Sequence, residues 1–125
     1  MAACAISGTT FASFLGLNVS SYASGKAAAE RLRYSDLGKR WRTCRTLIID
    51  EISMVNAATF AFAEEFARIM RNSSKPFGGI QVVTCGDFFQ LPPVARDGAV
   101  SFAFEADSWN VVFGPSSTVE LMQVI

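Results

Sequence analysis

Asp50 and Glu51 are adjacent carboxylates that directly follow a short apolar run, residues 47–49. One carboxylate can hold a hard cation such as Mg²⁺, directly or through water, because oxygen ligands suit that ion. The other can polarise a water molecule for attack on a phosphoryl group. Neighbouring residues of an extended strand point to opposite faces, so the two acids are not expected to share one role. The alternative is a strand end whose acids are simply solvated.

A second polar cluster, residues 86–93, follows another apolar run and contains Gln90. A glutamine just past a strand can sense a terminal phosphate and orient the attacking water. Gly86 allows backbone to come close, and Pro92 and Pro93 stiffen the loop. The alternative is an ordinary exit from strand to loop.

The elements that must position these clusters are two short strands with a helix between them. Residues 47–49 have the apolar character of a strand that is buried on both faces, and residues 80–85 have that of a second buried strand. Asn56 can cap a helix that runs to about Arg71. The order of strand, helix and strand favours an α/β fold with a parallel sheet and right-handed crossovers. In such sheets, ligands bind off the carboxyl edge of the strands, where both polar clusters begin.

The remaining segments carry weaker patterns. Residues 1–25 predict a short helix or loop, and residues 27–37 predict a helix because they are good helix formers. We expect a helical turn near residues 104–109 and a last strand near residues 118–121. On the helix after Asn56, Glu64 and Arg68 are four residues apart and are expected to pair on the outside.

The composition excludes several classes of protein. The chain has 125 residues, the size of one domain or of a piece of a larger one. It is 50% hydrophobic and 18% charged, which is too apolar for a disordered chain and too poor in charge for a coiled coil. Its net charge is +0, so any nucleic-acid contact must be local. The absence of histidine excludes His-ligated metal sites and Ser-His-Asp triads.

The cysteines and the hydropathy bear on the compartment. Cys4, Cys44 and Cys85 are far apart and form no C-x-x-C pair, which indicates reduced thiols inside the cell. No window reaches the ~18 unbroken apolar residues that a spanning helix needs. Polar residues interrupt the first apolar stretch, so it does not fit a signal peptide. We therefore expect an intracellular protein without a membrane segment.

The two clusters together resemble segments of a known family, the petite-integration-frequency (Pif) DNA helicases. Residues 47–55 resemble the Walker B segment (motif II) of this family, and residues 78–94 resemble its motif III. Residues 2–14 are similar to its motif Ia, and residues 102–109 also resemble the family. The similarity covers nearly the whole chain in the family's order, and motifs II and III are specific in combination.

The resemblance implies a RecA-like P-loop NTPase motor domain of a superfamily-one helicase over residues 1–125. Such enzymes couple ATP hydrolysis to 5′-to-3′ movement on single-stranded DNA. Carried over by position, Asp50 would organise Mg²⁺, Glu51 would be the catalytic base, and Gln90 would contact the γ-phosphate and the attacking water. The resemblance also implies that the enzyme acts at duplex junctions, in DNA repair, recombination and telomere or organelle-genome maintenance. It further implies a location in the nucleus, the mitochondrion or both.

Motif Ia implies a set of DNA contacts from small and hydroxyl residues, which suit close approach to phosphates. These candidates are Gly8, Thr9, Thr10 and Ser13, with Phe14 packing beneath them. An anchor in the protein core is the alternative for Phe14. Ala12 stands where the family usually has His, which removes one polar group from the DNA-facing segment.

Several parts that the family has are not found in this sequence. No G-x-x-x-x-G-K-[ST] phosphate loop occurs, and Gly25-Lys26 is a decoy because Ala27 follows the lysine instead of Ser or Thr. The phosphate-loop strand and the second motor domain with its arginine finger are not found either, so we interpret the chain as an internal fragment of a helicase. Losing one positioned donor commonly costs ~10²–10³ in rate, and an arginine finger is worth ~10³–10⁵. These 125 residues alone are therefore expected to have no useful ATPase activity, and to leave sheet edges and apolar surface unpaired.

Two other functions stay open at this point. One is a degenerate paralogue that keeps the fold as a DNA-binding or interaction module, which Ala12 and the missing loop motivate. The other is an unrelated nucleotide-driven ATPase of RecA type. That enzyme would hydrolyse ATP independently of DNA, whereas a helicase should be stimulated by single-stranded DNA.

Overall fold

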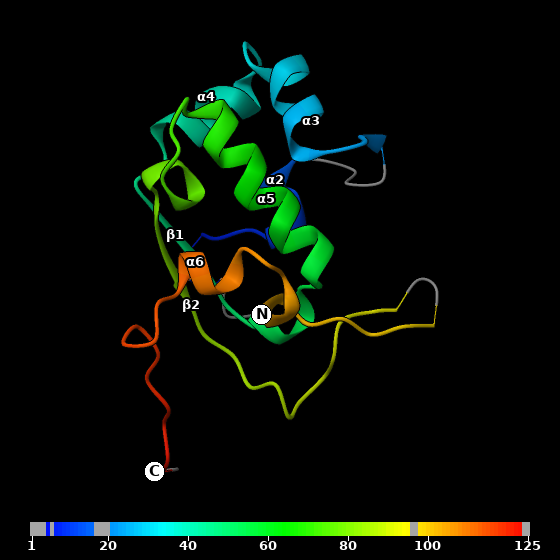
Figure 1. Cartoon of the computed structure of the whole chain (residues 1–125), viewed down its shortest axis with the longest axis vertical. Helices are drawn as coiled ribbons and strands as arrows, with labels where there is room; N and C mark the ends of the chain where they lie inside the picture. The colour runs from blue at the N-terminus through cyan, green and yellow to red at the C-terminus, as the bar shows by residue number, and fades with distance from the viewer. Residues whose placement is uncertain (1–4, 6, 17–20, 96–97, 124–125) are drawn as a thin grey trace.

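The computed structural model describes residue 5 and residues 7–16, 21–95 and 98–123 (Figure 1). The helices, in chain order, are α2 (Phe11–Leu15), α3 (Gly25–Leu32), α4 (Asp36–Thr43), α5 (Ala57–Met70) and α6 (Trp109–Val112). The strands are β1 (Thr46–Ile49) and β2 (Gln81–Thr84). Short 3₁₀ helices lie between them: η2 (Ile52–Met54), η3 (Pro76–Gly79) and η4 (Ala103–Glu105).

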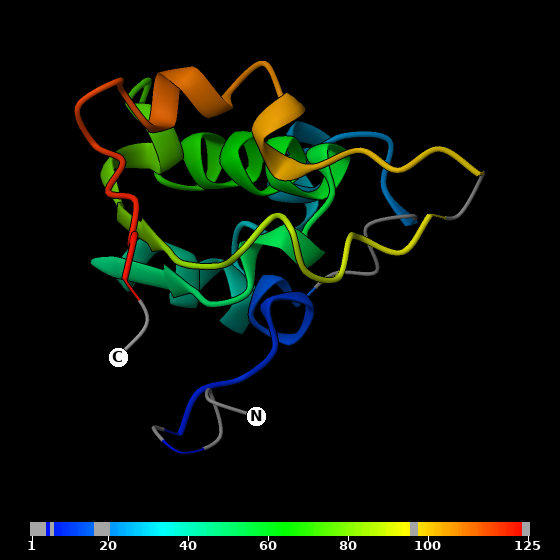
Figure 2. The same ribbon diagram turned by 90° about the horizontal axis from the view of Figure 1, so that it is seen from below.

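β1 and β2 form a parallel two-stranded sheet, with Thr46 opposite Gln81 and Ile49 opposite Thr84. The connection between them contains α5, which lies between the sheet and α6 (Figure 2). This confirms the predicted order of strand, helix and strand. Each strand ends immediately before one of the two polar clusters, so both clusters start at the same edge.

β1 is buried on one face only, and β2 is half-buried on the corresponding face. Leu47 and Ile49 belong to the core, whereas Ile48 is 63% exposed and Val83 is 44% exposed. In the part of the chain that the structure describes, the prediction that residues 47–49 are buried on both faces is therefore wrong, and the buried strand predicted at residues 80–85 is only half-buried. The apolar run alone did not show that one face would lack a covering element, although unpaired apolar surface was expected.

Helix α5 organises the core. Its start is fixed by Asn56, whose Oδ1 accepts a hydrogen bond from the N–H of Thr59 at 2.7 Å, as predicted for a capping residue. Fully buried Phe66 contacts Trp41 of α4 edge-on, with ring centroids 5.5 Å apart. Removing a buried phenylalanine typically costs ~3–5 kcal/mol, so this face of α5 contributes strongly to stability.

Glu64 of α5 is not on the outside of the molecule, contrary to the sequence-based expectation. Glu64 is only 6% exposed. Its carboxylate pairs with Arg68 and also accepts a hydrogen bond from the N–H of Phe77 at 3.3 Å. The helix pattern indicated the pairing correctly. It could not show that η3 folds back over this part of α5.

The helix predicted over residues 27–37 is in fact two helices, α3 and α4. Ser35 accepts a hydrogen bond from the N–H of Gly38 at 3.1 Å, which starts α4 and ends the continuity with α3. At the start of α3, a Cβ on Gly25 would lie 2.6 Å from the carbonyl oxygen of Phe62. Glycine at this position allows close packing of α3 on α5, which accounts for Gly25 without a phosphate loop.

Arg71 joins the ends of three elements. Its Nη1 donates to the carbonyl oxygens of Trp41, Arg42 and Cys44 at 2.9, 2.8 and 3.0 Å, and its Nε donates to Gly78 at 2.8 Å. These bonds satisfy carbonyl groups at the end of α4 that the helix itself leaves without partners. Arg71 thereby fixes the chain that enters β1.

The predictions for the two ends of the chain were partly correct. The short helix or loop expected within residues 1–25 is present as α2, and residues 1–4, 6 and 17–20 lie outside the described residues. The turn expected near residues 104–109 is present as η4 and α6. The strand expected at residues 118–121 is wrong, because this segment is exposed and irregular and pairs with neither described strand. No helix in the described ranges combines the length and apolarity needed to cross a membrane.

Candidate active site

The carboxyl ends of β1 and β2 are joined by backbone hydrogen bonds beyond the last strand residues. The N–H of Cys85 donates to the carbonyl of Ile49 at 3.0 Å, and the N–H of Ile52 donates to the carbonyl of Cys85 at 3.0 Å. Asp50 and Glu51 lie between these two bonds, and both residues are exposed. The structure therefore places the two predicted acids on the open rim of the sheet, directly beside the start of the second polar cluster.

The carboxylate of Asp50 is held by two donors on one oxygen. Its Oδ1 accepts from the N–H of Glu51 at 3.0 Å and from the thiol of Cys85 at 3.1 Å. Among the described residues, all hydrogen bonds to this carboxylate end on Oδ1. The arrangement leaves Oδ2 as a hard oxygen that can face a cation or a bound water.

The thiol of Cys85 is a hydrogen-bond donor in this environment. The hydrogen bond to Asp50 raises the pKa of the thiol, and partial burial and the negative charges of Asp50 and Glu51 raise it further. All three causes disfavour a thiolate beside two carboxylates. The thiol is therefore kept protonated at neutral pH.

Glu51 has a backbone conformation that is uncommon for a side-chain-bearing residue. Its φ of 53° and ψ of 48° lie in the left-handed region, immediately before η2. Such a conformation costs roughly 1–2 kcal/mol for an L-residue, and strained residues of this kind cluster at functional sites. Glu51 is therefore not part of an extended strand, so the alternation of side chains along a strand, on which the expectation of separate roles was based, does not apply here.

Gln90 is exposed in a turn just beyond β2. Its N–H donates to the carbonyl of Asp87 at 3.1 Å, and its side-chain amide donates to Oδ2 of Asp87 at 3.2 Å. The N–H of Phe89 donates to the other carboxylate oxygen of Asp87 at 2.9 Å. Gln90 thus lies in the loop that leaves the carboxyl end of β2, and its hydrogen bonds within the described residues go to Asp87, not to Asp50 or Glu51.

Two contacts hold the loop that carries Gln90. A Cβ on Gly86 would lie 3.0 Å from the nitrogen of Ile52, so a small residue is needed where the loop crosses the segment after Glu51. Phe88 packs edge-on against Phe104, with ring centroids 4.8 Å apart. The loop is therefore fixed on one side by the acid-bearing segment and on the other by η4.

The predicted DNA-binding residues lie at the start of α2. Gly8, Thr9, Thr10 and Ser13 are exposed, and Phe14 is half-buried. Thr10 caps α2, since its hydroxyl oxygen accepts from the N–H of Ser13 at 3.1 Å and its O–H reaches the hydroxyl of Ser13 at 3.0 Å. These contacts give Thr10 and Ser13 a structural use in addition to the predicted one.

Phe14 packs against the protein rather than standing in solvent. Its ring centroid is 5.1 Å from that of Trp41, and the guanidinium of Arg40 lies 5.7 Å from the ring centroid. Arg40 also donates to the carbonyls of Ser13 and Phe14 at 3.3 and 3.1 Å. The geometry favours the core-anchor interpretation of Phe14 and adds an exposed cation, Arg40, beside the predicted DNA segment.

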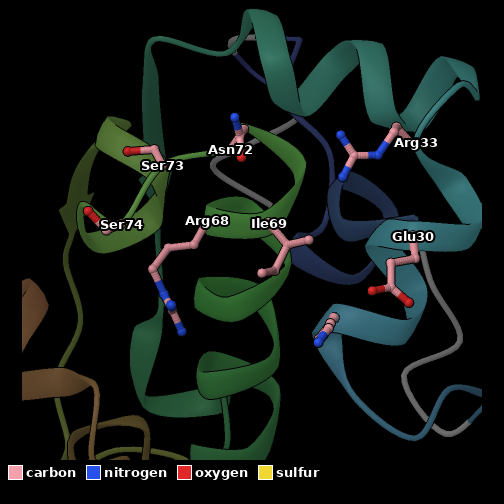
Figure 3. Close-up of a pocket in the computed structure, with 8 residues that line it drawn as sticks. Glu30, Arg33, Arg68, Ile69, Asn72, Ser73 and Ser74 are labelled. Atoms are coloured by element: carbon pink, nitrogen blue, oxygen red, sulfur yellow. The ribbon is translucent and has the colours of Figure 1, made fainter.

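A hollow of about 440 Å³ lies elsewhere, between α3 and the end of α5 (Figure 3). It is lined by Lys26, Glu30, Arg33, Arg68, Ile69, Asn72, Ser73 and Ser74. Figure 3 shows Glu30 and Arg33 on one side and Arg68 and Ser73 on the other, with Ile69 between them. Neither the two acids nor Gln90 lines this hollow, so it is separate from the predicted site.

No group of three or more Cys, Asp or Glu side chains in the described part of the chain could enclose a metal ion. A cation at this edge would therefore depend on Asp50 together with water and the substrate itself. Such incomplete protein coordination is usual for Mg²⁺, which keeps several waters and binds through one or two carboxylates and substrate phosphates.

The sequence-based prediction missed two residues near the predicted sites. Cys85 follows β2 just as Asp50 follows β1, and it is the register of the two parallel strands, known only from the structure, that places the two residues side by side. Arg40 was missed because α4 was not predicted as a separate helix. The signal for α4 is Ser35 followed by Asp36, a typical helix start.

Comparison with known proteins yields a consistent set of similarities. A family model described as PIF1-like helicase matches residues 1–123. The ATP-dependent DNA helicase PIF1 of Danio rerio is 43% identical over 125 residues, which are 99% of this chain and 19% of that protein. The chain therefore spans about a fifth of the length of this relative.

Solved structures give the same picture. A crystal structure of the Pif1 helicase from Candida albicans matches 87% of this chain and 25% of that chain, with 42% identity and a TM-score of 0.77. The Pif1 helicase from Bacteroides, in complex with ADP-AlF3 and single-stranded DNA, matches 86% of this chain and 27% of that chain, with 31% identity and a TM-score of 0.66. The α/β, RecA-like fold predicted from the sequence is thereby confirmed.

Proposed function

Because this chain belongs to the PIF1-like helicase family, we propose that it forms part of an ATP-dependent DNA helicase. The observation that carries the proposal is the arrangement at the sheet edge, where Asp50 and Glu51 adjoin the segment that leads to Gln90. The longer chain that would contain this segment is called the parent helicase below. It would couple ATP hydrolysis to 5′-to-3′ translocation on single-stranded DNA and to unwinding at duplex junctions.

In this proposal the residues have separate tasks. Asp50 would hold Mg²⁺, for which its exposed carboxylate oxygen and its fixed orientation are suitable. The cation would supply positive charge to the phosphates of ATP. Glu51 would accept a proton from the attacking water, and Gln90 would orient that water and contact the γ-phosphate.

DNA would run along the α2 segment. The exposed residues Gly8, Thr9, Thr10 and Ser13 would approach the phosphates, and Phe14 would support them from below. Arg40 adds a cation beside this segment, which suits a polyanion in a chain whose total net charge is +0. Similarity to a Bacteroides Pif1 helicase in complex with single-stranded DNA supports the choice of partner.

The parent helicase would act in DNA repair, recombination and telomere or organelle-genome maintenance, in the nucleus, the mitochondrion or both. The segment alone would have no useful ATPase activity, since its sequence contains no phosphate-loop motif. A degenerate paralogue that binds DNA or a partner without hydrolysis is the second candidate, favoured by Ala12 at a position where the family usually has His.

A DNA-stimulated ATPase assay on the parent helicase tests the proposal, with the 125-residue chain as the matched control. We expect hydrolysis by the parent helicase that rises on addition of single-stranded DNA, and none by the control. Transcript sequence upstream of Met1 supplies an independent check. An in-frame phosphate loop there supports the enzyme, and a genuine promoter and stop codon support the non-catalytic module.

A further inference from the structure

We propose that Cys85 is a positioning residue for the cation site, acting through the carboxylate of Asp50. The inference rests on the proposed function, because it concerns the same site. Its basis is the hydrogen bond from Sγ of Cys85 to Oδ1 of Asp50, at 3.1 Å. With Oδ1 occupied by this thiol and by the N–H of Glu51, Oδ2 is the oxygen that would be left to hold a cation.

Backbone hydrogen bonds hold Cys85 in a fixed position beside Asp50. Cys85 bonds to both sides of the acid segment, through its N–H to Ile49 and through its carbonyl to Ile52, each at 3.0 Å. Its Cα is thereby fixed relative to Asp50 by the sheet ladder. A short side chain on a fixed backbone has few rotamers, so the position of Sγ relative to the carboxylate of Asp50 is well defined.

A thiol has suitable chemistry for orienting a cation-binding carboxylate. It is a neutral donor, so it fixes the carboxylate without cancelling the negative charge that attracts Mg²⁺. Sulfur is a soft ligand that Mg²⁺ does not prefer, so Cys85 does not compete with Asp50 for the ion. A lysine or arginine at this position would orient the carboxylate and also repel the cation.

The surroundings of Cys85 argue against a role in packing alone. Cys85 is exposed, whereas Cys44 is half-buried and packs against the core. The thiol of Cys44 lies 3.5 Å from the carbonyl of Thr46, a backbone group remote from the site. Cys44 is therefore a matched control, a cysteine of the same chain without contact to a catalytic carboxylate.

The experiment measures binding of a fluorescent, non-hydrolysable ATP analogue to the parent helicase at a series of Mg²⁺ concentrations. Partners that orient a metal ligand are typically worth 10- to 100-fold in metal affinity, and a thiol is a weak donor. We therefore expect Cys85→Ala to raise the half-saturating Mg²⁺ concentration about 3- to 10-fold. Cys85→Ser, which keeps a donor, should restore the wild-type value, and Cys44→Ala should not change it.

The outcomes separate the inference from the proposed function. Nucleotide binding by Cys85→Ala with the wild-type Mg²⁺ dependence overturns the positioning role and leaves the helicase assignment standing. A parent helicase that shows no Mg²⁺-dependent nucleotide binding at all overturns both. If Cys85→Ala does not fold, Cys85→Val fills the same space without a donor, and the same two results decide.

Discussion

Arg68 contacts both carboxylate oxygens of Glu64 through its Nε, at 2.8 and 3.0 Å, one turn apart on α5. The side chain of Glu64 is 8% exposed and that of Arg68 is 36% exposed. A third donor, the N–H of Phe77, completes the surroundings of the carboxylate. The pair therefore joins α5 to η3 at the end of the helix that leads into β2.

Replacing Arg68 with Met should destabilise the chain, because it leaves the buried carboxylate of Glu64 without its charged partner. Removal of one partner from a buried pair costs about 3–5 kcal/mol, and the partial exposure of Arg68 reduces this to about 1–3 kcal/mol. Urea unfolding of the 125-residue chain measures the difference. Arg31→Met, at an exposed position of α3, is the matched control and should change stability by less than about 0.5 kcal/mol.

Glu51→Gln in the parent helicase should leave ATP binding intact and abolish turnover. The amide keeps the shape of the side chain and cannot accept the proton of the attacking water. Loss of a general base typically lowers the rate by about 10²- to 10⁴-fold. Turnover is read from a DNA-stimulated ATPase assay and binding from a fluorescent nucleotide; normal turnover in this variant would refute the assignment of Glu51 as the base.

Gln90→Ala should slow hydrolysis or uncouple it from DNA unwinding, with little change in folding. The side chain is exposed and bonds only to Asp87 among the described residues, so its removal does not open the core. Loss of one positioned donor commonly lowers the rate on the order of 10²-fold. ATPase and strand-separation assays on the same preparation test this, and wild-type unwinding would count against a role for Gln90 in sensing the phosphate.

The two strands and the helix between them could be predicted from the sequence because their signals are local. The apolar runs before Asp50 and Gly86 end abruptly in polar residues, and the order of strand, helix and strand fixes the carboxyl ends at one edge. The start of α5 was also predicted from a local signal, the capping residue Asn56.

The features that were missed depend on contacts between distant segments. Helix periodicity showed that Glu64 and Arg68 are neighbours, but the burial of Glu64 follows from η3, which comes later in the chain. The exposure of Ile48 depends on what covers the second face of the sheet. The hydrogen bond from Cys85 to Asp50 requires the strand register, which no local pattern gives.

The thiol of Cys44 should make the stability of the chain depend on pH. Partial burial raises the pKa of this thiol, against the opposing effect of the Arg71 guanidinium. A pKa that is higher in the folded than in the unfolded chain favours folding while the thiol is protonated. The contribution of Cys44 should thus be complete below the ordinary thiol pKa and should be lost as the pH rises through the raised value. Urea unfolding of wild type and Cys44→Ala at pH 7 to 10 measures it, and a difference that grows with pH contradicts the prediction.

Glu51→Gly should separate stability from activity at the same position. The left-handed backbone of Glu51, with φ of 53°, is costly for a residue with a Cβ and costs glycine nothing. We expect the free energy of unfolding of the 125-residue chain to stay constant or rise by up to about 1 kcal/mol. Met54→Gly, three residues further on at an exposed position without positive φ, should instead lower it by about 0.5–1 kcal/mol. In the parent helicase, Glu51→Gly should lose turnover as Glu51→Gln does.

Equal destabilisation by the two glycine variants would show that the backbone at Glu51 is not strained. The carboxylate of Glu51 would then be retained at no cost in stability.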